Sequence, residues 1–130
     1  MINLRVLLVD DEDELVETLA ERLILRDIDA RWATNAEDAL DMVENEIFDL
    51  AVLDVKMPGI SGITLKKQLE RKIPEMKFIF MTGHGSEADF HAGSREAGSD
   101  YYLVKPVNID DLIKKMKEVM ASDGDKNDQQ

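Results

Sequence analysis

Polar residues with the chemistry of phosphate binding follow four short apolar segments of the sequence. They are Asp10 and Asp11 after 4–9, Asp54 after 49–53, Thr82 after 78–81, and Lys105 after 101–104. If these segments are parallel strands, their carboxyl ends meet at one edge of a sheet, where open α/β folds bind ligands. Three carboxylates, a hydroxyl and an ammonium group at one edge describe a magnesium-dependent site for phosphoryl transfer.

The elements that would position these residues alternate along the chain as apolar segments and amphipathic stretches. We expect strands over 4–9, 28–33, 49–53, 78–81 and 101–104. We expect five helices: one over 12–25, one that begins after a cap at Thr34 or Asn35, one around Leu65 and Leu69, one over 86–97, and one that begins after a cap at Asn108. The helix over 86–97 is the least marked, because its apolar face is mostly alanine and Gly93 disfavours a helix. Strict βα alternation predicts the α/β class, with a doubly wound, five-stranded parallel sheet.

Length and composition agree with one domain of this kind. The chain has 130 residues, of which 44% are hydrophobic, and we expect the domain over residues 1–121. Residues 122–130 are polar and have no helical periodicity. We therefore expect a disordered tail there, or the start of a linker.

Charge and apolar pattern exclude several classes of partner. The net charge of −12 repels nucleic acid phosphates, so we expect no direct nucleic acid binding by this chain. No apolar run approaches the ~20 residues that span a bilayer, and no signal-peptide pattern opens the sequence. With no cysteine in the chain, we expect a cytoplasmic protein that does not enter a membrane. The acidity itself indicates either solubility or a basic protein partner.

Each candidate residue taken alone has an ordinary structural explanation. The explanations are a helix cap or dipole partner for Asp10 and Asp11, a turn for Asp54, a cap for Thr82, and a solvated strand end for Lys105. The combination favours a site, because every strand but the second contributes one of these residues. A Met57-Pro58-Gly59 turn also follows Asp54, and Lys105 precedes Pro106 in a bond that is a candidate for the cis form.

Four motifs, in this order and spacing, resemble the receiver domains of two-component response regulators. The motifs are Leu7-Leu8-Val9-Asp10-Asp11-Glu12, Leu53-Asp54-Val55-Lys56-Met57-Pro58-Gly59-Ile60-Ser61-Gly62, Met81-Thr82-Gly83 and Tyr102-Leu103-Val104-Lys105-Pro106. The resemblance extends from about Leu4 to Ala121, and the length is similar to that of single-domain members such as chemotaxis regulators. It implies a (βα)5 flavodoxin-like fold with strand order 2-1-3-4-5.

The resemblance also implies a role for each site residue. Asp54 would be the phosphoacceptor. Asp11 would bind magnesium directly, Asp10 mostly through water, and Lys56 through its backbone carbonyl. Lys105 and Thr82 would contact the phosphoryl oxygens, and Tyr102 would be the aromatic switch. One Mg²⁺ would be bound, with Asp54 also in its shell. The ring of Tyr102 would move inward as Thr82 shifts toward the phosphoryl group. Lys56 and His84 lie at variable positions that flank this group in the family, so we hypothesise that they alter its lifetime.

The implied function is that of a phosphorylation-activated switch rather than an enzyme with a free substrate. Asp54 would accept a phosphoryl group from a phosphohistidine of a sensor histidine kinase or phosphotransfer protein, in a self-catalysed reaction reset by auto-dephosphorylation. The surface of the helix over 86–97, the last strand and the last helix would then change and control a downstream partner or effector domain. A phosphorylation-dependent homodimer is a further expectation. Val107 stands where the family often has phenylalanine, so packing under the last helix would differ.

Three other classes of protein fit the sequence less well. A haloacid-dehalogenase-like phosphatase needs a second aspartate two residues after the nucleophile, and that position is Lys56. A flavodoxin-like electron carrier needs a hydroxyl-rich loop after the first strand, and Asp10-Asp11-Glu12 would repel flavin phosphate. A phosphorylation-independent interaction module remains, but the complete set of site residues argues against it.

Overall fold

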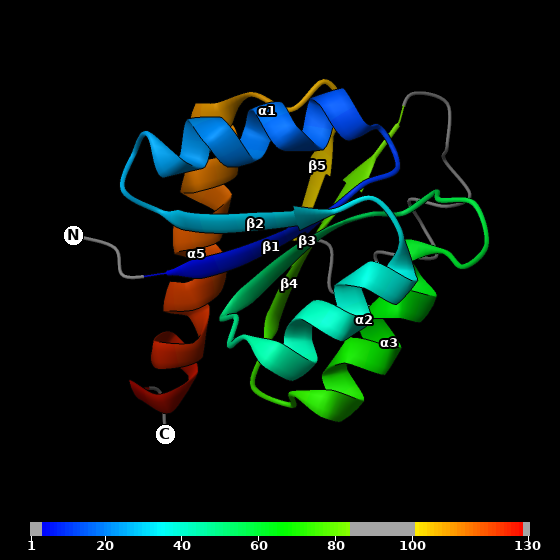
Figure 1. Ribbon diagram of the computed structural model, residues 1–130. Helices are drawn as coiled ribbons and strands as arrows, with labels where there is room; N and C mark the ends of the chain where they lie inside the picture. The colour runs from blue at the N-terminus through cyan, green and yellow to red at the C-terminus, as the bar shows by residue number, and fades with distance from the viewer. Residues whose placement is uncertain (1–3, 84–100, 129–130) are drawn as a thin grey trace.

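The computed structural model describes residues 4–83 and 101–128 as a five-stranded parallel sheet between two layers of helices (Figure 1). The elements are β1 (Arg5–Val9), α1 (Asp13–Ile24), β2 (Asp29–Ala33), α2 (Ala36–Asn45), β3 (Leu50–Asp54), α3 (Gly62–Lys72), β4 (Lys77–Thr82), β5 (Tyr102–Val104) and α5 (Ile109–Asp128). The helix predicted over 86–97 lies outside the described residues.

The strand order is β2-β1-β3-β4-β5, with every neighbouring pair parallel. This confirms the predicted order 2-1-3-4-5. The chain leaves β1 toward β2 on one side and returns to β3 on the other, so the winding direction reverses between β1 and β3. In open α/β sheets such a reversal creates a crevice at the carboxyl ends of the strands.

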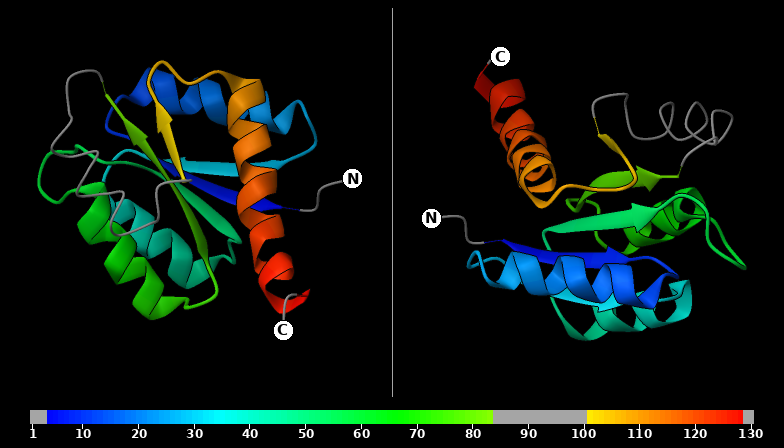
Figure 2. Two further views of the ribbon diagram at one scale, coloured as in Figure 1. Left: turned by 180° about the vertical axis from the view of Figure 1, so that it is seen from behind. Right: turned by 90° about the horizontal axis from the view of Figure 1, so that it is seen from above.

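Helices cover both faces of the sheet, which confirms the doubly wound architecture. Buried residues of α1 and α5 pack with one face, and those of α2 and α3 pack with the other (Figure 2). In β1, Leu7 belongs to the second of these cores and Leu8 to the first, and both are fully buried. A strand covered on both faces needs apolar residues at successive positions, which explains the continuous apolar runs in the sequence.

Side-chain caps fix the starts of three helices. Oδ1 of Asn35 accepts the backbone N–H of Asp38 at 2.8 Å, so Asn35 rather than Thr34 caps α2. Oδ1 of Asn108 accepts the N–H of Asp110 at 2.8 Å, which confirms the predicted cap of α5. Ser61 caps α3 in the same way. These caps satisfy donors that the first helical turn leaves without a partner.

The last helix is longer than the sequence pattern predicts. α5 continues to Asp128 and therefore passes through most of the segment 122–130, where we expected a disordered tail. Helical backbone hydrogen bonds do not require an apolar face, so a helix docked by its first three turns can continue into polar sequence. The domain limit at residue 121 stays a prediction. Within the described residues, no helix is long and apolar enough to cross a membrane.

Candidate functional site

The register of the sheet brings the predicted site residues to one edge. Val9 pairs with Leu53, so the next residues, Asp10 and Asp54, leave neighbouring strands at the same level. Thr82 directly follows Met81, the partner of Asp54, and Lys105 directly follows the partner of Thr82. The carboxyl ends of β1, β3, β4 and β5 therefore place these residues at the same edge of the sheet, beside the crevice between β1 and β3.

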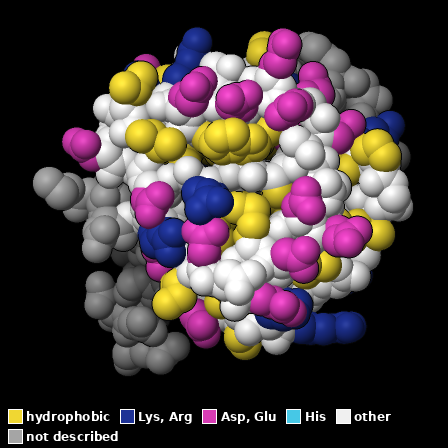
Figure 3. Space-filling view, viewed as in Figure 1, with side chains coloured by type: hydrophobic (Ala, Val, Ile, Leu, Met, Phe, Trp, Pro, Cys, Tyr) yellow, Lys and Arg dark blue, Asp and Glu magenta, His cyan; other side chains and the backbone are white. Residues whose placement is uncertain are grey.

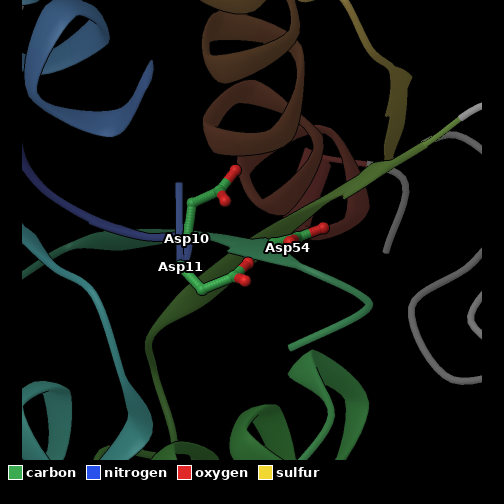
Figure 4. Close-up of side chains that lie close together, drawn as sticks. All are labelled: Asp10, Asp11 and Asp54. Atoms are coloured by element: carbon green, nitrogen blue, oxygen red, sulfur yellow. The ribbon is translucent and has the colours of Figure 1, made fainter. Parts of the chain in front are cut away.

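Three carboxylates form the centre of the site. Oxygens of Asp10, Asp11 and Asp54 all lie within 4.8 Å of one another (Figure 4). Asp10 is fully buried and Asp54 is 5% exposed, whereas Asp11 is exposed. Like charges this close repel by about 4 kcal/mol per pair at an effective dielectric constant of 20. The group is therefore unfavourable unless a cation or protons neutralise it.

Lys105 supplies one neutralising cation. Its Nζ is 2.7 Å from Oδ2 of Asp10 and 3.5 Å from Oδ2 of Asp54. The same ammonium donates a hydrogen bond of 3.0 Å to Oε1 of Glu12. The contact with Asp10 is an ion pair with poor hydrogen-bond alignment, since Oδ2 of Asp10 accepts no hydrogen bond from the described residues.

Burial and charge shift the pKa values of all three groups. Desolvation raises the pKa of Asp54 from 3.8 to about 7, helped by the charges of Asp10 and Asp11 and opposed by Lys105. Desolvation also raises the pKa of Asp10, although Lys105 and the N–H of Glu12 act to lower it. Burial acts to lower the pKa of Lys105, but the surrounding carboxylates outweigh it and raise that pKa. One lysine thus leaves the acidic group incompletely neutralised.

This donor set suits a hard divalent cation. Magnesium prefers carboxylate oxygens, a few waters and phosphate oxygens, and Asp10, Asp11 and Asp54 present carboxylates from two strand ends. Oδ2 of Asp10 is buried and accepts no hydrogen bond from the described residues, although the Lys105 ammonium lies 2.7 Å away, so it can also bind a metal or a water bound to one. Burial is the chief cause of the raised pKa of Asp54, and the charges of Asp10 and Asp11 add a repulsion that a bound cation would relieve.

Thr82 and Tyr102 lie in the buried part of the same region. Thr82 is 2% exposed, and its carbonyl accepts the N–H of Lys105 at 2.7 Å, which ties the ends of β4 and β5 together. The Tyr102 side chain is buried and stacks on Phe80, with ring centroids 5.4 Å apart. The switch role that the resemblance implies for Tyr102 stays a prediction. The Lys105–Pro106 peptide bond is cis, as its sequence indicated.

The loop from β3 to α3 contains a residue whose importance the sequence did not reveal. Gly62 begins α3 directly against the backbone of Asp54, where any Cβ would overlap the carbonyl of Asp54. Its N–H donates to the carbonyl of Val55 at 2.9 Å, so the close approach is held by a hydrogen bond. Gly59 has a φ of 88°, which favours glycine. The sequence offered one indication of this close approach, which was the glycine Gly62 directly after the capping residue Ser61.

Glu12 is a second residue to which the sequence assigned no role. It occupies the N-cap of α1, but its side chain makes no capping hydrogen bond and extends to Lys105 instead. Lys56 lies exposed in the loop after β3, and its predicted metal contact stays a prediction. His84, the other residue predicted to alter phosphoryl lifetime, lies outside the described residues.

One face of the molecule carries more acidic than basic side chains. On the face in Figure 3, Asp and Glu side chains are spread over the molecule, and basic side chains gather at a few points. Two of the arginines, Arg5 and Arg31, are themselves paired with Glu46 at 3.0 Å. The expectation that the chain does not bind nucleic acid directly stays a prediction.

Comparisons with known sequences agree on one family. A family model described as "Response regulator receiver domain" matches residues 6–117. The transcriptional regulatory protein CpxR of Escherichia coli strain K12 is 38% identical over 116 residues, which cover 89% of this chain and 49% of CpxR. The response regulator MprA of Mycobacterium bovis is 30% identical over 119 residues, which cover 92% of this chain and 51% of MprA. The chain spans about half the length of these curated relatives.

Solved structures lead to the same family. One is a response regulator receiver domain protein from Methanospirillum hungatei, described as CheY-like. It has a TM-score of 0.83 and 33% sequence identity, and the match covers 96% of this chain and 99% of the solved chain. The response regulator TrrA of Thermotoga maritima was solved in complex with Mg²⁺ and BeF. It has a TM-score of 0.76 and 34% sequence identity, and the match covers 91% of this chain and 99% of the solved chain. The similarity therefore includes nearly the whole length of both solved chains.

Proposed function

The chain belongs to the response regulator receiver domain family, and from this premise we propose that it is a phosphorylation-activated signalling switch with Asp54 as its phosphoacceptor. The donor would be a phosphohistidine of a sensor histidine kinase or of a histidine phosphotransfer protein. One observation carries the proposal: a nearly buried carboxylate, Asp54, lies within 4.8 Å of two further carboxylates and 3.5 Å from a lysine ammonium. That arrangement suits a transferring phosphoryl group and its metal ion.

The proposed reaction is a direct transfer between the two proteins. An oxygen of ionised Asp54 attacks phosphorus, the new O–P bond forms, and the P–N bond to histidine breaks, with the electron pair left on the imidazole nitrogen. Because the pKa of Asp54 is about 7 without a metal, part of the population is protonated and unreactive near neutral pH. Lys105 favours the ionised form and can contact the phosphoryl oxygens once they arrive.

Magnesium is the proposed cofactor, one ion per site. Asp10, Asp11 and Asp54 would hold it, with the backbone carbonyl of Lys56 as a further ligand. When bound, the ion supplies charge neutralisation for the carboxylates and for the phosphoryl oxygens that approach them. Asp10 and Asp11 thus serve the reaction by binding the ion, and Asp54 serves as nucleophile.

The proposed output begins at Thr82 and Tyr102. Phosphorylation replaces the single charge of Asp54 by a larger anion, to which the Thr82 hydroxyl can donate a hydrogen bond. Tyr102 would transmit this movement to the surface formed by the fourth helix, β5 and α5. A downstream partner, an effector domain or a second phosphorylated copy would recognise that surface. The relatives CpxR, named a transcriptional regulatory protein, and MprA, named a response regulator, support a regulatory output for this chain.

The protein is proposed to catalyse only reactions of its own Asp54. Phosphotransfer and auto-dephosphorylation would both take place at this residue, and the protein would act in the cytoplasm. Lys56 and His84 would alter the lifetime of the phosphoryl group. Dephosphorylation rates of Lys56→Ala, His84→Ala and the double variant test this role, and three unchanged rates would contradict it.

Intact mass spectrometry tests the proposal. The protein is incubated with phosphoramidate and Mg²⁺, and we expect one added phosphoryl group. Asp54→Ala, or chelation of Mg²⁺, should abolish the addition. Asp41→Ala, which removes an exposed carboxylate of α2, should leave it unchanged. An equal addition to Asp54→Ala would contradict the proposal, and rapid turnover of unrelated phosphate esters would indicate a hydrolase instead.

A further inference from the structure

The hydrogen bond between Glu12 and Lys105 joins residues 93 positions apart in the sequence. Glu12 is the N-cap residue of α1, a position where a side chain normally accepts an N–H of the first helical turn. Here the side chain leaves that role unfilled and contacts the site lysine. Glu12 is also separate from the group of three carboxylates suited to a metal. Its contact therefore concerns the lysine and not the cation.

The Lys105 ammonium already lies among three carboxylates, and its hydrogen bond goes to Glu12. An ammonium group has three N–H donors, and three carboxylates surround this one, at 2.7 Å for Asp10, 3.0 Å for Glu12 and 3.5 Å for Asp54. A phosphoryl group on Asp54 brings further oxygens that need the same ammonium. A shift of the ammonium toward these oxygens draws it away from one of its present partners.

The cost of that exchange differs sharply between the partners. Asp10 is fully buried, so separating its carboxylate from Lys105 would leave a buried charge without its lysine. The side chain of Glu12 is 62% exposed, so water can replace the lysine at little cost. The exposed partner, Glu12, is the one that is released.

We propose that Glu12 is a positioning residue that holds Lys105 while Asp54 is unphosphorylated and competes with the phosphoryl group for the lysine ammonium. The inference rests on the proposed function of Asp54 and adds a residue that biases the switch toward its unphosphorylated state. Because an exposed ion pair is weak, the bias is on the order of 2- to 5-fold in the affinity for a phosphoryl group. It decreases as salt screens the pair.

The affinity for beryllium fluoride in the presence of Mg²⁺ tests the competition by calorimetry. Glu12→Gln keeps the size of the side chain and removes its charge, so we expect tighter binding by about 2- to 5-fold at low salt. Glu14→Gln removes an exposed charge from the same first turn and should bind like the wild type. A residue that merely supported the site would weaken binding when replaced.

A double-mutant cycle separates competition from general repulsion of the anion. In a Lys105→Met background, Glu12→Gln should no longer tighten binding, because there is no ammonium to compete for. Equal tightening in both backgrounds would overturn the proposal. If beryllium fluoride does not bind wild-type protein at all, the proposed function fails first; if it binds and Glu12→Gln has no effect, only the present inference fails.

The NMR signals of the Lys105 side chain provide a readout that does not depend on binding strength. The ¹⁵Nζ and ¹³Cε resonances, assigned by their loss in Lys105→Arg, should shift in Glu12→Gln protein without ligand. With Mg²⁺ and beryllium fluoride, the Glu12→Gln and wild-type signals should coincide, since the contact has then been released. Identical signals before ligand addition, or a difference that persists afterwards, would contradict the competition.

Discussion

The ionised carboxylate of Asp54 should destabilise the fold when no metal is bound. The pKa of this group rises from 3.8 to about 7 on folding, chiefly through burial. Because the folded state holds its proton more tightly, protonation stabilises the fold fully below the lower value, and this stabilisation is lost as pH rises to about 7. At about 1.4 kcal/mol per pH unit, the loss amounts to as much as about 4 kcal/mol at about pH 8.

Asp54→Asn imitates the neutral carboxyl group without changing its shape. We therefore expect the variant to be more stable than the wild type by up to about 4 kcal/mol at about pH 8 in a chelator, and by progressively less toward about pH 4. Urea denaturation at several pH values measures both free energies of unfolding. Added Mg²⁺ should narrow the gap at about pH 8, because the wild type keeps all three carboxylates and gains more from the ion.

Asp41→Asn is the matched control for this experiment, since it neutralises an exposed carboxylate on α2. It should leave the free energy of unfolding within about 0.5 kcal/mol of the wild type. Equal stability of wild type and Asp54→Asn at about pH 8 in chelator would refute the reasoning. A stability gap that does not shrink as pH falls would refute it as well, because the gap would then not come from ionisation.

Three further substitutions test other parts of the site. Gly62→Ala should lower the free energy of unfolding by about 1 to 3 kcal/mol and reduce phosphorylation, since the new Cβ would overlap the carbonyl of Asp54. In the control Gly59→Ala, the new Cβ meets no atom within 4 Å, so only the backbone is strained. Thermal unfolding measures the stability of both variants, and intact mass measures their phosphorylation. Lys105→Met should lower stability by about 2 kcal/mol in chelator by leaving Asp10 unpaired, and Mg²⁺ should restore part of the loss in a urea titration. Asn108→Ala should cost about 1 kcal/mol in the same titration by uncapping α5, with phosphorylation of Asp54 unchanged.

Much of the fold followed from patterns that are local in the sequence. Apolar runs that are buried on both faces have few alternatives to inner parallel strands, so β1, β3 and β4 were predicted to within two residues at each end. Helix starts were predicted at Asn108 and at either Thr34 or Asn35, because short polar side chains accept the first free N–H groups. The meeting of Asp10, Asp54 and Lys105 then followed from one geometric rule about the edges of parallel sheets.

The features that escaped prediction depend on the paths of loops and on solvent exposure. The sequence assigned no role to Glu12, because only the direction in which α1 leaves β1 brings it to Lys105. The contact of Gly62 with the Asp54 backbone depends on how the intervening loop folds back. The extent of α5 was underestimated, because helical periodicity reports the docked part of a helix and not its continuation into polar sequence.

Locating the phosphoryl group tests the central claim most directly. After treatment with phosphoramidate and Mg²⁺, borohydride reduces an acyl phosphate to an alcohol, which converts a phosphorylated aspartate to homoserine. Peptide mapping by mass spectrometry then identifies the modified residue. We expect homoserine at position 54 and unmodified aspartate at positions 10 and 11. Homoserine at either of those positions, or none in a protein that has gained a phosphoryl group, would contradict the assignment of Asp54 as phosphoacceptor.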